Sequence, residues 1–234
     1  KVAGAQARGA RGILIYSDPA DDGFSKGEPL PKGPWRSADL LQRGNAKLSW
    51  FFHGDPLTPG RAAVAGAPRL RPEDAPTLPR IPAAVLSWSA ARPLLEHLSG
   101  KAPDGFQGAL EFPYGTGPGP ARAALDVEMD AGQKPIANVL GRLRGREEPE
   151  SFVLVGAHHD AWTFGGVDPG SSGAALLELA RVLGTLARGD WRPRRSIVFA
   201  FWDAEEPGLI GSTEHAEEQA AELRSRAVAY VNTD

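Results

Sequence analysis

The pattern of hydrophobic and polar residues divides the chain into two parts. In residues 1–132, short apolar runs such as 13–16 and 83–86 are separated by long stretches rich in proline and glycine, such as 29–34. Proline and glycine interrupt regular structure, so this part is expected to be a loop-rich, mainly β domain. A helix is predicted at 89–98, where leucines share one face.

From residue 133 onward, longer apolar segments alternate between the spacing typical of buried strands and that of helices. The expected elements are strands at 136–144 and 152–157, a helix at 171–186, a strand at 196–202, a helix at 212–226 with Ser212 as its N-cap, and a strand at 228–233. Alternation of strands and helices is typical of an open α/β sheet with parallel members.

Composition excludes several function classes. The 26 Lys and Arg residues are offset by 29 Asp and Glu residues, and no basic block stands apart, which disfavours nucleic-acid binding. No apolar run reaches the length of a membrane span, so no membrane contact is expected within this segment. With no cysteine, any metal must be held by histidines and carboxylates. Because Met129 is the only methionine and the sequence stops at a predicted buried strand, we expect a piece of a longer chain.

Histidine and carboxylate side chains follow three of the predicted strands directly. His158 ends one strand, Glu205 and Glu206 follow the next, and Asp234 ends the last. In open α/β sheets, ligands bind outside the carboxyl ends of strands, so these side chains are expected to meet in one crevice. Asp168, on a glycine-bounded loop, is placed to bridge two cations there.

Longer motifs surround these residues. They lie at 158–162, 164–169, 191–195, 202–206 and 211–214, and in the first part at 16–21, 42–45 and 54–60. Together they resemble the glutamate carboxypeptidase II, or N-acetylated alpha-linked acidic dipeptidase, branch of the M28 zinc peptidases. The resemblance implies an α/β fold: an open mixed-sheet peptidase core with an attached mainly β protease-associated (apical) domain. Residues 1–132 would be the apical domain, and 133–234 the amino-terminal part of a peptidase domain that continues further.

The resemblance also implies roles for the clustered residues. His158 and Asp234 would bind one zinc ion, Glu206 the other, and Asp168 would bridge the two, with Glu205 as general base. Two divalent ions about 3.5–4 Å apart polarise a carbonyl and lower the pKa of a shared water, whose proton an adjacent free carboxylate can accept. Hydrolysis is therefore the expected reaction.

Further contacts follow from the same resemblance. Asp160 would accept the second imidazole N–H of the zinc-binding histidine and fix its tautomer. Asn45 of the apical domain, with Gly208 and Leu209, would contact substrate. Another zinc-binding histidine and the basic residues of the substrate pocket are expected beyond the last residue, which would leave this segment an incomplete catalyst. Pro207 stands where the family usually has an aromatic residue, and this alters the shape of the pocket.

A second metal site is predicted on the helix at 212–226. Glu214 and Glu217 lie three residues apart on one face, where like charges repel unless a cation lies between them. The resemblance implies a structural calcium ion there, completed by the backbone carbonyls of Thr58 and Arg61 and joining the two domains. Arg61 replaces the family's usual tyrosine, but only its carbonyl is needed. The alternative is that glutamates near a helix N-terminus are favoured without any metal.

The function implied is that of a dizinc carboxypeptidase. It would release a carboxyl-terminal glutamate or similar residue from small acidic peptides or folate-like poly-γ-glutamates. One alternative is a non-catalytic binding protein of the transferrin receptor type, which lacks the metal ligands present here. The other is an aminopeptidase of the same superfamily, against which Asn45 argues. The resemblance further implies a homodimer formed through a carboxyl-terminal domain and a location outside the cytoplasm: secreted, periplasmic or membrane-anchored.

Overall fold

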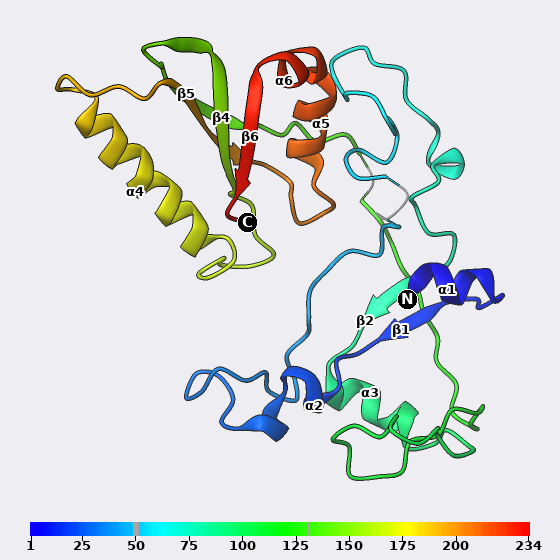
Figure 1. Cartoon of the computed structure of the whole chain (residues 1–234). Coiled ribbons are helices and arrows are strands. Elements are labelled where there is room, and N and C mark those ends of the chain that lie inside the picture. Colours follow the sequence, from blue (N-terminus) through cyan, green and yellow to red (C-terminus); the bar gives the residue numbers. More distant parts are fainter. Residues whose placement is uncertain (49–51, 131) are drawn as a thin grey trace. The chain divides into compact units, whose positions relative to one another are not determined.

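The computed structural model describes residues 1–48, 52–130 and 132–234, which form two units (Figure 1). The first unit comprises Lys1–Ala46 and Pro79–Ala131, and the second comprises Lys47–Leu78 and Gly132–Asp234. The sequence predicted one boundary after residue 132. The difference is the 47–78 segment, which contacts the carboxyl-terminal half through hydrogen bonds described below. The assignment of a protease-associated domain stays a prediction.

The first unit is rich in loops, as expected, but its described residues hold little β structure. Its elements are α1 (Val2–Ala7), β1 (Ile13–Ile15), α2 (Pro19–Asp22), a 3-10 turn at Phe24–Lys26, β2 (Ala83–Val85) and α3 (Trp88–Leu95). The two strands have three residues each and pair in parallel. Proline and glycine flank the apolar runs and keep them this short. The predicted helix at 89–98 is confirmed as α3, with a shorter carboxyl end.

Asp18, within the 16–21 motif, connects separate loops of this unit. Its carboxylate accepts hydrogen bonds from the backbone N–H of Ala20 at 2.9 Å, which caps α2, and of Ala109 at 3.0 Å. It also accepts the hydroxyl proton of Tyr114, whose oxygen accepts the N–H of Leu110 at 3.1 Å. Burial, together with this hydrogen bond to Asp18, raises the pKa of Tyr114. The motif therefore has a structural role.

The second unit contains a four-stranded sheet flanked by helices. Its elements are a 3-10 turn at Pro72–Asp74, β3 (Val139–Leu143), β4 (Glu148–His158), α4 (Gly170–Leu186), β5 (Arg195–Trp202), α5 (Ile210–Glu218), α6 (Ala220–Arg226) and β6 (Ala227–Asn232). The strand order is β3-β5-β4-β6. β4 is parallel to β5 and β6, whereas β3 is antiparallel to β5, so the predicted mixed α/β sheet is confirmed.

The two faces of the sheet bury alternate residues of the central strands. Leu154 of β4 and Trp202 of β5 belong to a core cluster packed against Leu223 of α6. Val155 and Phe199 belong to a second cluster, with Leu176 of α4. Figure 1 shows α4 on one side of the sheet and α5 and α6 on the other. Each fully buried side chain of this size contributes roughly 1.5–3 kcal/mol, so both clusters fix the strand ends that carry the site. No helix in the described ranges is long and apolar enough to cross a membrane.

The predicted helix at 212–226 is wrong in two respects. The structure has two helices, α5 and α6, which are separated at Gln219. The first begins at Ile210, after Leu209 in a left-handed conformation (φ 56°), so Ser212 is not its N-cap. The Ser212 hydroxyl instead donates to the Leu209 carbonyl at 3.4 Å. A tight hydrogen-bonded turn, rather than a capping side chain, starts the helix.

Candidate active site

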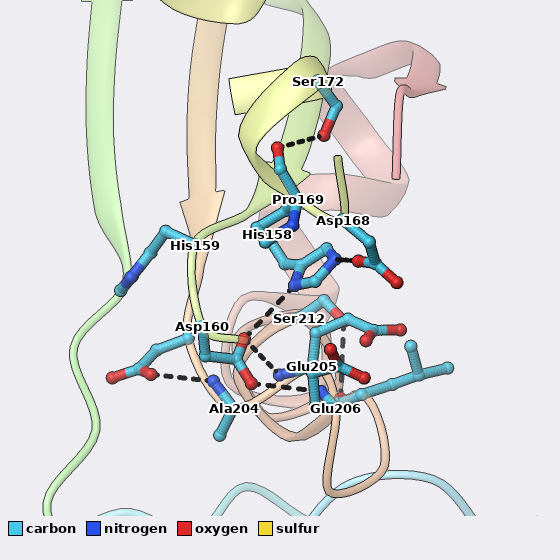
Figure 2. A network of polar contacts seen from close by, with 12 residues as sticks. His158, His159, Asp160, Asp168, Pro169, Ser172, Ala204, Glu205, Glu206 and Ser212 are labelled. Carbon is cyan, nitrogen blue, oxygen red and sulfur yellow. Dashed lines mark hydrogen bonds and ion pairs between the residues drawn. The ribbon is translucent and has the colours of Figure 1, made fainter. Parts of the chain in front are cut away.

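His158 lies at the carboxyl end of β4 between two carboxylates (Figure 2). Its side chain is 2% exposed, and its Nε2 lies 2.9 Å from Asp168 Oδ1. Its Nδ1 lies 3.4 Å from Asp160 Oδ1, an ion-pair distance. Burial lowers the pKa of His158, but the negative charges of Glu205 and Asp160 and the contact with Asp168 outweigh this effect, and the pKa is raised. The structure thus brings His158 and Asp168 together, as predicted.

Asp160 holds the chain that carries the two glutamates. Its Oδ1 accepts the backbone N–H of Glu205 at 2.8 Å, and its Oδ2 accepts that of Glu206 at 3.1 Å (Figure 2). The sequence predicted only the imidazole as its partner. The two backbone contacts mean that one carboxylate fixes the turn after β5 as well as facing the histidine at the end of β4.

The turn after β5 is fixed by residues that the sequence analysis did not single out. Asp203 Oδ1 accepts the N–H of Ala204 at 2.8 Å, and its Oδ2 accepts that of Ala137 at 2.8 Å. Asn138 Oδ1 accepts the N–H of Asp203 at 3.0 Å, while its Nδ2 donates to the Gly211 carbonyl at 2.8 Å. The sequence feature that could have indicated these contacts is Asn138, a polar residue directly before β3.

The pKa values of both glutamates in this turn are raised. For Glu205 the main cause is burial, and the charges of Glu206, Asp234 and Asp160 add to it against the opposing effect of His158. For Glu206 the main cause is again burial, followed by the charge of Asp168. Carboxylates crowded in this way are stabilised in their charged form by a cation among them.

Asp234 lies at the edge of a cavity of about 520 Å³ that is also lined by His158 and Glu205. Leu209, predicted to contact substrate, lines the same cavity. The remaining walls are mainly apolar and come from β4, β5, β6, α5 and α6. They include the rings of Trp202 and His215, whose centroids are 5.2 Å apart. Asn45 lies in the first unit, and its predicted contact with substrate stays a prediction.

The donor set fits zinc in its chemistry. Imidazole nitrogen and carboxylate oxygen are ordinary zinc ligands. The Nδ1 atom of His158 is buried without a hydrogen bond from the described residues, while Nε2 points at Asp168. Within the described ranges, no three His, Asp or Glu side chains already form a closed set of ligands. Of the four predicted zinc ligands, His158 and Asp168 are in direct contact, at 2.9 Å.

The predicted calcium ligands all belong to the second unit. Glu214 accepts the backbone N–H groups of Asp55 at 2.6 Å and Ala63 at 2.5 Å, which ties α5 to the 47–78 segment. Glu217 Oε2 is buried without a hydrogen-bond partner among the described residues, and burial, with the nearby Glu214 charge, raises its pKa. Thr58 is 1% exposed. The side chain of Arg61, which with Glu217 lines a surface hollow, donates to the Pro68 carbonyl.

The known proteins that this chain resembles are named as peptidases. Residues 138–234 match the model of peptidase family M28. The whole chain is 43% identical to mouse "Aminopeptidase NAALADL1", 41% identical to "Probable glutamate carboxypeptidase LAMP1" of Arabidopsis thaliana and 40% identical to "Glutamate carboxypeptidase 2 homolog" of Caenorhabditis briggsae. It spans about a third of each (33%, 33% and 32%). A solved peptidase M28 precursor from Shewanella amazonensis aligns over 39% of this chain and 21% of its own, with 33% identity and a TM-score of 0.35.

Proposed function

We propose, from the match of residues 138–234 to the model of peptidase family M28, that the full-length protein is a co-catalytic dizinc carboxypeptidase acting on small acidic peptides. The observation that carries the proposal is the convergence at one sheet edge of His158, Asp168 and the two glutamates anchored by Asp160. His158, Asp168, Glu206 and Asp234 would hold the metal ions. A receptor-like binding protein without catalysis would have no need of these metal ligands together with a free glutamate.

The chain's own residues supply the proton transfers. Bound zinc would polarise the scissile carbonyl and acidify a water molecule. Glu205, which the proposal leaves unbound to metal, accepts the proton of that water and returns it to the leaving amine. Asp160 keeps both glutamates in position through their backbone N–H groups.

Release of a carboxyl-terminal glutamate is supported by the names of the Arabidopsis and Caenorhabditis relatives. The mouse and rat relatives are named aminopeptidases, which favours a second candidate, cleavage at the amino end. The metal ligands serve either reaction, because both hydrolyse a peptide bond. The two candidates differ only in which charged terminus of the peptide the enzyme binds.

The test compares two substrates on the zinc-loaded, full-length protein. We expect release of glutamate from an N-acyl-aspartyl-glutamate dipeptide, which has no free amino terminus, and loss of this activity on chelation with recovery on adding zinc. Cleavage of an unblocked dipeptide amide without cleavage of the N-acyl dipeptide would instead support the aminopeptidase. Hydrolysis of neither peptide would refute both and favour the receptor-like protein.

We also propose that Glu214 and Glu217 bind a calcium ion with the Thr58 and Arg61 carbonyls. The buried Glu217 oxygen, which has no hydrogen-bond partner among the described residues, supports this, because a buried charge without a partner is costly. Calcium at about 100 times its dissociation constant would stabilise the folded protein by roughly 2.7 kcal/mol, which raises Tm by several degrees.

The calcium prediction is checked by thermal unfolding with and without calcium. Glu217→Gln removes the charge and is expected to abolish the rise in Tm, whereas Glu218→Gln, a change at an exposed neighbour, is expected to keep it. An equal rise in both variants would contradict the site.

A further inference from the structure

The ammonium group of Lys47 contacts the chain just after the two glutamates. Lys47 Nζ donates to the Gly54 carbonyl and lies 3.5 Å from the Gly208 carbonyl, to which the Gly54 N–H also donates at 3.0 Å. Gly208 follows Glu206 by two residues. Two donors from the 47–78 segment therefore meet at a single carbonyl of the catalytic turn, all within the second unit.

The environment of Lys47 keeps this contact in place. The side chain is half-buried, and burial lowers its pKa, while the negative charges of Asp55 and Glu214 oppose that effect. These two carboxylates favour the ammonium form. A charged donor gives a stronger hydrogen bond to a carbonyl than a neutral one, and partial burial shields it from competing water.

The turn itself requires such support. Ala204 and Leu209 have left-handed conformations, with φ of 52° and 56°, and Gly208 has a φ of 131°. Non-glycine residues in this region cost free energy and persist only when their surroundings hold them. The N–H groups of Gly208 and Leu209 donate to the Glu205 carbonyl at 2.8 and 2.6 Å. A shift of Gly208 is thus transmitted directly to the backbone of Glu205.

The 47–78 segment packs closely against the turn after β5 and against α5. Gly54 has a φ of 78°, and a Cβ added there would lie 2.5 Å from Glu214 Oε1 and 2.9 Å from a side-chain atom of Thr213. Together with the Glu214 contacts to Asp55 and Ala63, this packing places the segment on α5 as well as on the turn. This packing fixes Gly54, whose carbonyl accepts the hydrogen bond from Lys47.

We propose that Lys47 is a positioning residue that holds the turn carrying Glu205 and Glu206 from its carboxyl end, opposite the hold that Asp160 exerts at its amino end. Its effect on zinc binding and hydrolysis rests on the proposed function. Its effect on the turn does not, because the hydrogen bonds to Gly54 and Gly208 exist whatever the protein hydrolyses.

The experiment compares Lys47→Met, Lys47→Arg and the exposed control Lys32→Met in the full-length protein. Amide hydrogen exchange is measured for peptides covering residues 203–211, zinc affinity by chelator competition, and kcat and KM with the N-acyl dipeptide. For K47M we expect faster exchange in 203–211 and at least tenfold weaker binding of the more weakly held zinc, on the scale of about 10–100-fold known for supporting contacts. A displaced general base should lower kcat by about tenfold or more with little change in KM.

The arginine variant should restore most of the protection and of kcat, since it retains a charged donor, and K32M should match the unmodified protein. If K47M exchanges like the unmodified protein in 203–211, or loses only thermal stability while kcat and zinc affinity are kept, Lys47 is not a positioning residue. Should K47M fail to fold, Lys47→Gln, which keeps a neutral donor, is judged by the same outcomes. Absence of zinc-dependent hydrolysis in the unmodified protein refutes the proposed function, and the exchange measurement still decides the role of Lys47.

Discussion

Replacing Glu205 by glutamine is expected to lower kcat by about 10³-fold while leaving zinc binding intact. The amide is nearly the same size as the carboxylate but cannot accept the proton of the attacking water, and positioned general bases contribute about 10²–10⁴-fold. The hydrogen bond from the Glu205 N–H to the Asp160 carboxylate does not involve the Glu205 side chain, so the turn should keep its shape.

The measurement is kcat with the N-acyl dipeptide beside the zinc content of the same sample, with Glu218→Gln as the control. Loss of zinc together with activity would show that Glu205 is a ligand. Activity within a few fold of the unmodified enzyme would remove it from the reaction.

Replacing Asp160 by alanine is expected to damage both metal binding and folding. The change removes the acceptor for the backbone N–H groups of Glu205 and Glu206 and the carboxylate facing His158 Nδ1. Loss of such supporting contacts lowers metal affinity by about 10–100-fold. An unpaired donor that is fully buried costs about 1–3 kcal/mol in the free energy of unfolding, and these two donors are partly buried, so the loss is expected at the lower end of that range for each.

Chelator competition and urea unfolding of the metal-free protein separate the two effects, with Asp190→Asn, at an exposed position, as the control. Unchanged stability of the metal-free variant would contradict the role of Asp160 as the anchor of the turn. Unchanged zinc affinity would contradict its role in orienting His158.

The central strands and the residues at their ends were predictable, because a strand that is buried on both faces of a sheet appears in the sequence as a continuous apolar run. Apolar runs at 152–157 and 196–202 correspond to β4 and β5, and the polar residues that follow them meet because parallel strands end at the same edge. The rule predicts that His158 and Glu205 share a crevice, and in the structure both residues line one cavity.

What sequence reasoning missed depends on contacts between residues distant in the chain. The 47–78 segment has no periodic pattern, and its association with α5 depends on the hydrogen bonds accepted by Glu214 and on the close approach of Gly54 to Thr213. Lys47 resembles any surface lysine until its neighbours are known. The break between α5 and α6 at Gln219 carries no proline or glycine signal, and the left-handed Leu209 that precedes α5 is an unfavourable choice for that conformation.

We propose that His158, Asp168, Glu206 and Asp234 hold two zinc ions in the full-length protein, and elemental analysis of the purified protein measures the zinc content. We expect about two zinc ions per chain, as in two-metal hydrolases, and a clear loss of zinc in Asp168→Ala, which removes the proposed bridging carboxylate. A zinc-free protein that takes up no zinc when the metal is added would contradict the claim.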